Sequence, residues 1–168
     1  MVNCAGCYRT LKIDYPEALG ELPFEVVHVT EFLSSLIADK KIKGLKSQKM
    51  KVTYHDPCLL GRHMEVYSEP REILGSIQGV DLVEMPRNKR FSWCCGSGSG
   101  VVSIGYPEFS NWVAMQRLLE AQSTGAEVLV TSCPGCYDNF SLTKSKEKDI
   151  QIKISDLTEL VASCLGTA

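Results

Sequence analysis

The sequence predicts a single α/β domain, with a mostly parallel sheet of about five strands flanked by helices. Two observations support this fold class. Short β-branched runs are bounded by glycine, proline or charged residues, and they alternate with stretches in which apolar residues recur every three or four positions. A length of 168 residues suits one domain. A chain of this size buries roughly two-thirds of its unfolded surface, which is enough to form a stable core.

Five short runs are expected to form strands, because they are rich in β-branched residues and end at turn residues. They are residues 24–29 (FEVVHV), 50–54 (MKVTY), 80–85 (VDLVEM), 127–131 (EVLVT) and 150–154 (IQIKI). Parallel strands end at a common edge, and in open α/β sheets ligands bind beyond that carboxyl edge. Residues that directly follow these runs are therefore the first candidates for a functional site.

Three segments are expected to be helices, because their apolar residues fall on one helical face. The apolar positions are Phe32, Leu33, Leu36 and Ile37 in the first, Trp112, Val113, Met115, Leu118 and Leu119 in the second, and Leu157, Leu160, Val161 and Cys164 in the third. Cys164 shares the apolar face of its helix, so we expect its thiol to lie in the core. His28 lies inside an apolar run and is expected to be a buried, hydrogen-bonded histidine.

Charge and hydropathy exclude several classes of protein. Eighteen Lys and Arg residues against 20 Asp and Glu residues give a formal net charge of -2, which disfavours a dedicated nucleic-acid binder. No stretch of 18 apolar residues occurs, so no transmembrane helix is expected. The first residues, MVNC, have neither the basic nor the apolar region of a secretory signal. The expected location is the cytoplasm, with contact to a membrane only through partner subunits.

Cysteine is the unusual component of the composition. The chain has eight cysteines, at Cys4, Cys7, Cys58, Cys94, Cys95, Cys133, Cys136 and Cys164. Inside a reducing cell, such a cluster indicates metal or redox chemistry in preference to disulfides. Five of them form a pattern: one cysteine, 35 residues, an adjacent pair, 37 residues and a CxxC pair. Each group falls at a predicted strand end or a glycine-rich turn, so the three groups can meet at one sheet edge.

The local sequence indicates what each cysteine group can do. Cys58 and Cys133 are expected at helix N-termini, where free N–H groups and the helix dipole favour the thiolate that binds metal. The adjacent Cys94 and Cys95 suit a polynuclear iron–sulfur cluster, because neighbouring sulfurs can reach different irons. The glycines of the following segment, 96–100 (GSGSG), let the backbone approach inorganic sulfide and donate hydrogen bonds to it.

Other interpretations of the same residues stay open. Four thiolates suffice for a tetrahedral zinc site, and free cysteines are often simply buried. A thioredoxin-like CxxC accounts for Cys133 and Cys136 but not for the other three cysteines of the pattern. His55 and His63 lie on either side of Cys58 and are candidates for ligation, for proton donation to a thiolate product, or for plain hydrogen bonding.

A short internal repeat bears on the domain organisation. Residues 2–8 (VNCAGCY) match residues 130–137 (VTSCPGCY), with one extra residue before the first cysteine of the later copy. We therefore expect residues 1–20 to be the tail of a preceding repeat, a CxxC pair with its helix, and residues 21–168 to be one complete domain. Cys4 and Cys7 are then additional or orphaned ligands, which we expect to be exposed and readily alkylated.

Three stretches carry a resemblance to a known family: HDPCLLGRH, SWCCGSGSGV and VTSCPGCYDNF, which together frame about residues 50–140. They resemble the cysteine-rich CCG domain of heterodisulfide reductase subunits of the HdrB and HdrD type, and the surrounding sequence is most similar to the archaeal HdrD type. This chain has one full copy of the motif plus the tail of another. The resemblance implies a noncubane 4Fe–4S cluster, ligated at the motif positions Cys58, Cys94, Cys95, Cys133 and Cys136.

The resemblance also implies an activity and partners. The expected function is that of an oxidoreductase subunit in which the cluster itself cleaves a thiol mixed disulfide, of the coenzyme M–coenzyme B type, in two one-electron steps. Electrons are expected from a partner subunit that carries iron–sulfur or flavin centres, or from a membrane cytochrome. The alternatives are a zinc-binding structural or assembly module and an electron-relay CCG domain of a lactate or glycerol-phosphate dehydrogenase-type complex.

Overall fold

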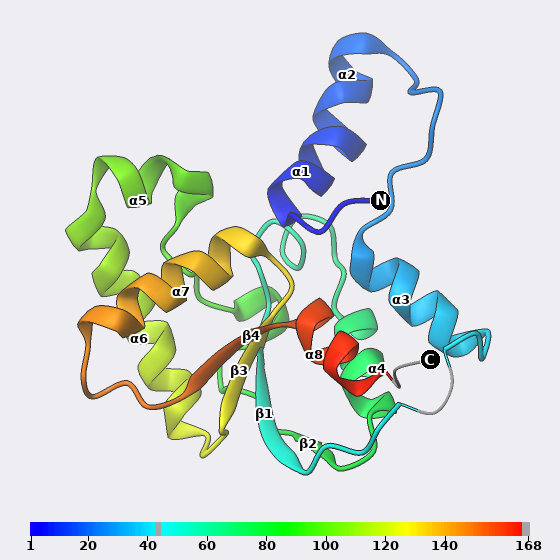
Figure 1. Ribbon diagram of the computed structural model, residues 1–168. Coiled ribbons are helices and arrows are strands. Elements are labelled where there is room, and N and C mark those ends of the chain that lie inside the picture. Colours follow the sequence, from blue (N-terminus) through cyan, green and yellow to red (C-terminus); the bar gives the residue numbers. More distant parts are fainter. Residues whose placement is uncertain (43–44, 166–168) are drawn as a thin grey trace.

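Four parallel strands form the sheet, in the order β2-β1-β3-β4 (Figure 1). The strands are β1 (Met50–His55), β2 (Val80–Leu82), β3 (Val128–Thr131) and β4 (Lys153–Asp156). The computed structural model describes residues 1–42 and 45–165. Residues 43–44 and 166–168 of the predicted main domain therefore lie outside the described residues. The α/β fold class expected from the sequence is confirmed.

Helices account for most of the remaining described chain. The α-helices are α1 (Ala5–Arg9), α2 (Tyr15–Leu19), α3 (Val29–Ala38), α4 (Ser68–Ser76), α5 (Val101–Gly105), α6 (Pro107–Ser123), α7 (Pro134–Lys146) and α8 (Leu157–Cys164). A π-helical turn η1 (Thr10–Asp14) joins α1 to α2, and two short 3₁₀ segments are η2 (Lys89–Phe91) and η3 (Gly98–Gly100). The three helices expected from apolar spacing are confirmed as α3, α6 and α8. Over the described ranges, no helix combines the length and the apolar character needed to cross a bilayer.

Two apolar cores lie on opposite faces of the sheet, because successive strand residues point to opposite sides. On one face, Leu129 of β3 packs in a cluster with Phe140 of α7 and with residues of α6. On the other face, Val130 packs in a cluster with Leu74 of α4 and Leu160 of α8. The sheet is therefore the middle layer between α6 and α7 on one side and α4 and α8 on the other (Figure 1).

The N-terminal segment packs on this body. Ala5 and Tyr8 of α1 are buried in the same apolar cluster as Leu129, although α1, η1 and α2 form an arm that projects from the domain (Figure 1). The two regions that the sequence divides at residue 20 thus share one core. Cys164 is fully buried in the core of the opposite face, as expected.

The expectation of a strand at residues 24–29 is wrong, and the sheet has four strands instead of five. Only an isolated bridge between Val2 and His28 forms there, and α3 begins at Val29. The reason is a capping interaction: the His28 ring accepts a hydrogen bond from the Thr30 N–H (3.3 Å), and Glu31 accepts one from the His28 N–H (2.9 Å). His28 is buried as expected, but it acts as the cap of a helix.

The ends of the strands determine where the segments that follow them begin. His55 of β1 is paired in register with Thr131 of β3, which is paired with Asp156 of β4, so three strands end level with one another. Cys133 is the N-cap residue of α7, so it lies at a helix N-terminus as expected. Cys58 does not begin a helix, and that expectation is wrong: successive turns follow it, closed by bonds such as Gly61 N–H to the Pro57 carbonyl (2.8 Å).

A buried guanidinium connects these strand ends to the rest of the domain. Arg117 of α6 is fully buried, and its Nη1 donates to Glu120 and to the Arg87 carbonyl, both at 2.7 Å. Its Nη2 donates to Ser92 Oγ (3.0 Å), and its Nε donates to Nδ1 of His55 (3.1 Å). A buried charge is tolerated only when it is paired and hydrogen-bonded. Here the bonds join β1, α6 and the loop before Cys94.

We expect Arg117→Met to lower the free energy of unfolding by about 3–5 kcal/mol, because it leaves the buried Glu120 carboxylate without its closest partner. Urea denaturation followed by circular dichroism measures this loss. The control is Arg9→Met, which removes a partly exposed pair with Asp14 and should cost less than about 1 kcal/mol. Equal losses in the two variants would contradict a special role for Arg117.

Candidate metal centre

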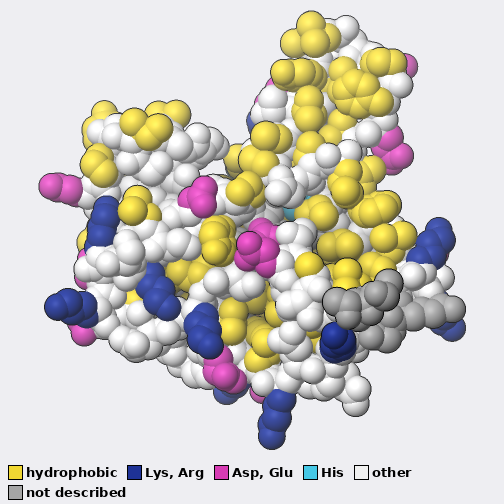
Figure 2. Space-filling view, viewed as in Figure 1, with side chains coloured by type: hydrophobic (Ala, Val, Ile, Leu, Met, Phe, Trp, Pro, Cys, Tyr) yellow, Lys and Arg dark blue, Asp and Glu magenta, His cyan; other side chains and the backbone are white. Residues whose placement is uncertain are grey.

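The five cysteines of the sequence pattern meet at the carboxyl edge of the sheet. They line a cavity of about 890 Å³, whose wall is formed by α1, the turn after β1, the loop 94–100, and the first turns of α7. Figure 2 shows the surface notched between the part formed by α5 and the arm formed by α1 and α2. The cysteines at this site are Cys58, Cys94, Cys95, Cys133 and Cys136, and all are free thiols.

Neighbouring sulfurs in this cavity influence one another's affinity for protons. The Cys58 thiol, with further help from Cys95 and the Gly96 N–H, lowers the pKa of Cys94. In the same way, the Cys136 thiol and then Cys4 lower the pKa of Cys133.

The pKa values of the two partner thiols, Cys58 and Cys136, shift upward. The pKa of Cys58 rises because of its interaction with Cys94, and that of Cys136 rises because of its interaction with Cys133. A crowded set of thiols that shares protons in this way is prepared to exchange them for metal cations, because metal binds the thiolate form.

The adjacent pair Cys94 and Cys95 is held by a tight backbone turn. Gly96 has φ +87°, and a Cβ there would lie 2.5 Å from the Ser110 carbonyl oxygen, so no other residue fits. Backbone N–H groups of Gly96 and Ser97 donate to the sulfurs of Cys94 (3.4 Å) and Cys95 (3.5 Å). Such bonds stabilise negative charge on sulfur.

Two buried side chains fix this turn against the helices behind it. Asn139 of α7 donates to the Cys95 carbonyl (2.7 Å), and Ser110 of α6 donates to the Gly96 carbonyl (2.9 Å). Ser110 Oγ also lies 3.1 Å from Asn139 Oδ1, so its single hydroxyl hydrogen is shared between these two acceptors. Neither residue was predicted from the sequence, because neither belongs to a recognisable ligand pattern.

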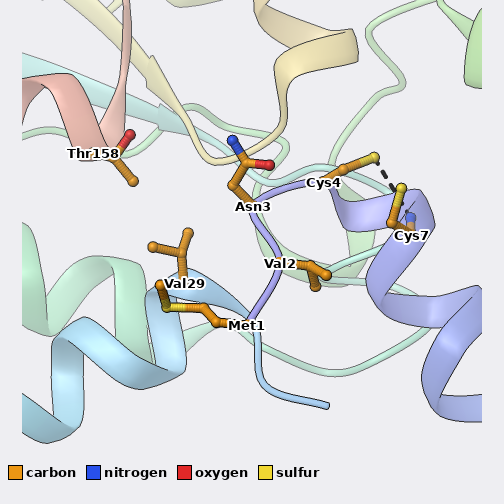
Figure 3. A pocket seen from close by; sticks show the side chains of 7 residues that line it. All are labelled: Met1, Val2, Asn3, Cys4, Cys7, Val29 and Thr158. Carbon is orange, nitrogen blue, oxygen red and sulfur yellow. Dashed lines mark hydrogen bonds between the residues drawn. The ribbon is translucent and has the colours of Figure 1, made fainter.

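Cys4 and Cys7 belong to the same cavity, a location that motif spacing left open. Cys4 caps α1, and Cys7 N–H donates to its sulfur at 3.5 Å (Figure 3). Cys7 is exposed as expected, whereas Cys4 is only partly exposed, because it lies beside Cys133. That interaction with Cys133, together with burial, raises the pKa of Cys4. Seven of the eight cysteines therefore line one cavity.

The two histidines near Cys58 have different surroundings. His63 is exposed and is not part of the cavity wall. His55 is fully buried, and its pKa is lowered to about 3, first by burial and then by the charge of Arg117. A ring nitrogen of His55 and the sulfurs of Cys95 and Cys136 lie within 4.8 Å of one another.

Asp56 lies within the motif HDPCLLGRH, but no role for it was predicted from the sequence. Its buried carboxylate accepts two hydrogen bonds from Arg71 (2.8 and 3.1 Å) and one from the Lys89 N–H (2.7 Å). It thereby fixes the segment between β1 and Cys58. Its position could have indicated this role, because a carboxylate directly after a buried strand needs hydrogen-bond or ion-pair partners.

The donor set is suited to a soft metal. Sulfur is the ligand atom that the cavity offers in greatest number, and thiolates select zinc or iron–sulfur clusters. A single tetrahedral zinc ion takes four ligands. The five pattern cysteines around the cavity are more than one zinc ion needs, so they fit a polynuclear centre better than a single zinc ion.

The pKa directions predict an order of reactivity in reduced, metal-free protein. Cys94 and Cys58 are both partly exposed, so they form a matched pair. At about pH 6, where an ordinary thiol is almost wholly protonated, we expect iodoacetamide to label Cys94 well before Cys58. The interaction with Cys94 raises the pKa of Cys58, so Cys58 should stay protonated and the difference should persist as the pH rises to neutral. Mass mapping measures both rates, and faster labelling of Cys58 would contradict the assignment.

Comparison with known proteins agrees with this site. A family model described as a cysteine-rich domain, CCG, matches residues 52–141. One subunit of the dihydromethanophenazine:CoB–CoM heterodisulfide reductase of Methanosarcina mazei is 49% identical over 164 residues, which cover 97% of this chain and 40% of that protein.

Two further relatives are similar over nearly the whole chain. One subunit of the fumarate reductase (CoM/CoB) of Methanothermobacter marburgensis is 39% identical over 94% of this chain and 30% of its own length. FadF, a probable iron-sulfur-binding oxidoreductase of Bacillus subtilis, is 38% identical over 95% of this chain and 22% of its own length. The chain thus spans less than half the length of these relatives. The family resemblance drawn from the three cysteine motifs is confirmed: the chain belongs to the CCG cysteine-rich domain family.

Proposed function

We propose that this domain holds an iron–sulfur cluster and serves as the redox domain of a heterodisulfide-reductase-like oxidoreductase. The observation that carries the proposal is the convergence of the pattern cysteines, from three distant parts of the chain, on one cavity of about 890 Å³. The relatives include a heterodisulfide reductase subunit and a probable iron-sulfur-binding oxidoreductase, and they support the same chemistry.

The proposed ligands are the five pattern cysteines, and the proposed cofactor is a noncubane 4Fe–4S cluster. Mutual lowering and raising of thiol pKa values supports a set in which several sulfurs bind one polynuclear centre. The N–H groups of Gly96 and Ser97 would continue to donate to the sulfurs of Cys94 and Cys95. The proposed ligand set is Cys58, Cys94, Cys95, Cys133 and Cys136.

Residues 1–20 are proposed to be the tail of a second repeat. Both CxxC pairs begin a helix, since Cys4 and Cys133 occupy the N-cap positions of α1 and α7. This common geometry supports the match between residues 2–8 and 130–137. Cys4 and Cys7 would then be orphaned ligands of that repeat, and both line the same cavity.

The proposed substrate is a small mixed disulfide of the coenzyme M–coenzyme B type. When bound, the cluster supplies electrons one at a time to the sulfur–sulfur bond. The cavity volume lies within the range of small-molecule sites. Leu59 and Leu142 contribute apolar surface to its wall. Arg9 also lines the wall, and its guanidinium is paired with Asp14 (2.8 Å).

Electrons would come from a partner subunit that carries iron–sulfur or flavin centres, or from a membrane cytochrome. The proposed location is the cytoplasm, with contact to a membrane only through partner subunits. One alternative has a specific observation in its favour. The relatives at 38–39% identity include a fumarate reductase subunit, so an electron-relay role without a disulfide substrate of its own is the second candidate. A cluster signal that does not change on addition of a thiol after oxidation would favour the relay.

Substitution of any one pattern cysteine by serine is expected to lower the bound iron by roughly half or more, because each supplies a ligand. Anaerobically purified protein should otherwise be brown, with about four irons and four sulfides per chain. Cys164→Ala is the matched control, because that thiol lies in the core behind the sheet. Colourless protein with one zinc would favour the structural module, and equal iron loss in Cys164→Ala would contradict the ligand set.

Alkylation of native, metal-loaded protein tests the positions of Cys4 and Cys7. We expect Cys7 to react fast because it is exposed, and the five pattern cysteines to be protected. Cys4 should react at an intermediate rate, because it is partly buried beside Cys133. Mass mapping after timed quenching gives each rate. Protection of both Cys4 and Cys7 equal to that of the five would make them ligands of the same centre, and fast labelling of all seven would contradict the proposal.

A further inference from the structure

One ring nitrogen of His55 is buried without a partner. The ring is fully buried at the end of β1, with its edge against the Phe140 ring at a centroid distance of 4.8 Å. Nδ1 accepts a hydrogen bond from Arg117 Nε, but Nε2 has no hydrogen-bond partner within residues 1–42 and 45–165. Buried polar atoms are nearly always satisfied, so this nitrogen is available to an acceptor at the adjoining cysteine site.

The bond from Arg117 determines which nitrogen carries the proton. A guanidinium donates hydrogen bonds but cannot accept them, so Nδ1 of His55 must be the unprotonated nitrogen that accepts the bond. The neutral ring therefore carries its proton on Nε2. Arg117 cannot turn away, because Glu120, Ser92 and the Arg87 carbonyl hold its other nitrogens. Nε2 is thus a fixed N–H donor, and a protonated nitrogen is not a metal ligand.

The sulfurs of Cys95 and Cys136 are the candidate acceptors for this donor. A ring nitrogen of His55 lies within 4.8 Å of both sulfurs. Cys95 already receives the Ser97 N–H, whereas no backbone N–H in the described part of the chain donates to the sulfur of Cys136. His55 would therefore supply the hydrogen bond that the fold does not provide to Cys136.

We propose that His55 is a positioning residue that donates its Nε2 proton in a hydrogen bond to the Cys95–Cys136 sulfur pair and so raises the reduction potential of the bound cluster. The inference rests on the proposed function, because it needs a cluster on those sulfurs. The physical reason is charge: reduction adds negative charge that spreads onto the ligand sulfurs, and a donor pointing at them stabilises the reduced form. No proton is transferred, so the effect does not depend on titration of the ring.

The first test uses the unmodified, cluster-loaded chain with ¹⁵N-labelled histidine. In the paramagnetic redox state, electron–nuclear double resonance should show a weak coupling to one histidine nitrogen and a weakly coupled proton that exchanges in D₂O. A strong nitrogen coupling would mean direct ligation, and no coupling would mean no contact. Either result overturns the inference.

The second test compares His55→Asn with His55→Gln by redox titration. The Asn side chain can still accept from Arg117 but is too short to reach the sulfurs, whereas Gln can accept with its oxygen and donate with its amide. We expect a more negative midpoint potential in His55→Asn, recovery toward the native value in His55→Gln, and native iron content in both. Unchanged potentials, or iron loss in His55→Asn equal to that in Cys136→Ser, overturn the inference.

The two proposals fail in different ways. Protein that binds no iron at all, with or without substitutions, contradicts the proposed function and removes the cluster on which this inference depends. Iron-loaded protein with a native disulfide-cleaving activity but no histidine coupling contradicts this inference alone.

Discussion

The guanidinium of Arg117 has to satisfy its charge entirely within the protein interior, and the way it does so constrains the architecture around the cysteine cavity. Its bonds reach β1 through His55, the approach to Cys94 through Ser92, and its own helix through Glu120. Breaking one of them would leave a buried charge poorly compensated, so the three segments hold one geometry. The cavity wall made by Cys94 and Cys95 is thereby tied to the end of the central strand.

The sulfur-rich wall is built by a second layer of polar contacts that are themselves buried. Asn139 and Ser110 hold the turn after Cys95, and Asp56 with Arg71 holds the segment before Cys58. These side chains contribute to a metal site without contacting the metal, because they hold the ligands of a polynuclear centre in position before it binds. The cost of crowding several thiols together is offset when protons are replaced by metal cations.

Two segments far apart in sequence contribute equivalent CxxC pairs to the same cavity. The pair of α1 and the pair of α7 both start at a helix N-terminus, and Cys4 lies beside Cys133. Helix N-termini present free N–H groups and a positive dipole end, and both favour thiolates. Bringing two such ends together concentrates sulfur ligands at one place without any long polar insertion.

The α/β class, the helices α3, α6 and α8, the core position of Cys164 and the family could all be predicted from the sequence, because periodicity, strand-end position and motif spacing are local properties. The conformation of residues 24–29 could not be predicted, because the helix cap formed by His28 and Glu31 outweighs the β propensity of this segment. Nor do local patterns place Cys4 beside Cys133 or leave Nε2 of His55 as a free donor. Those features depend on which strands are neighbours and on how one buried arginine distributes its hydrogen bonds, and such long-range pairings form only when the whole chain has folded.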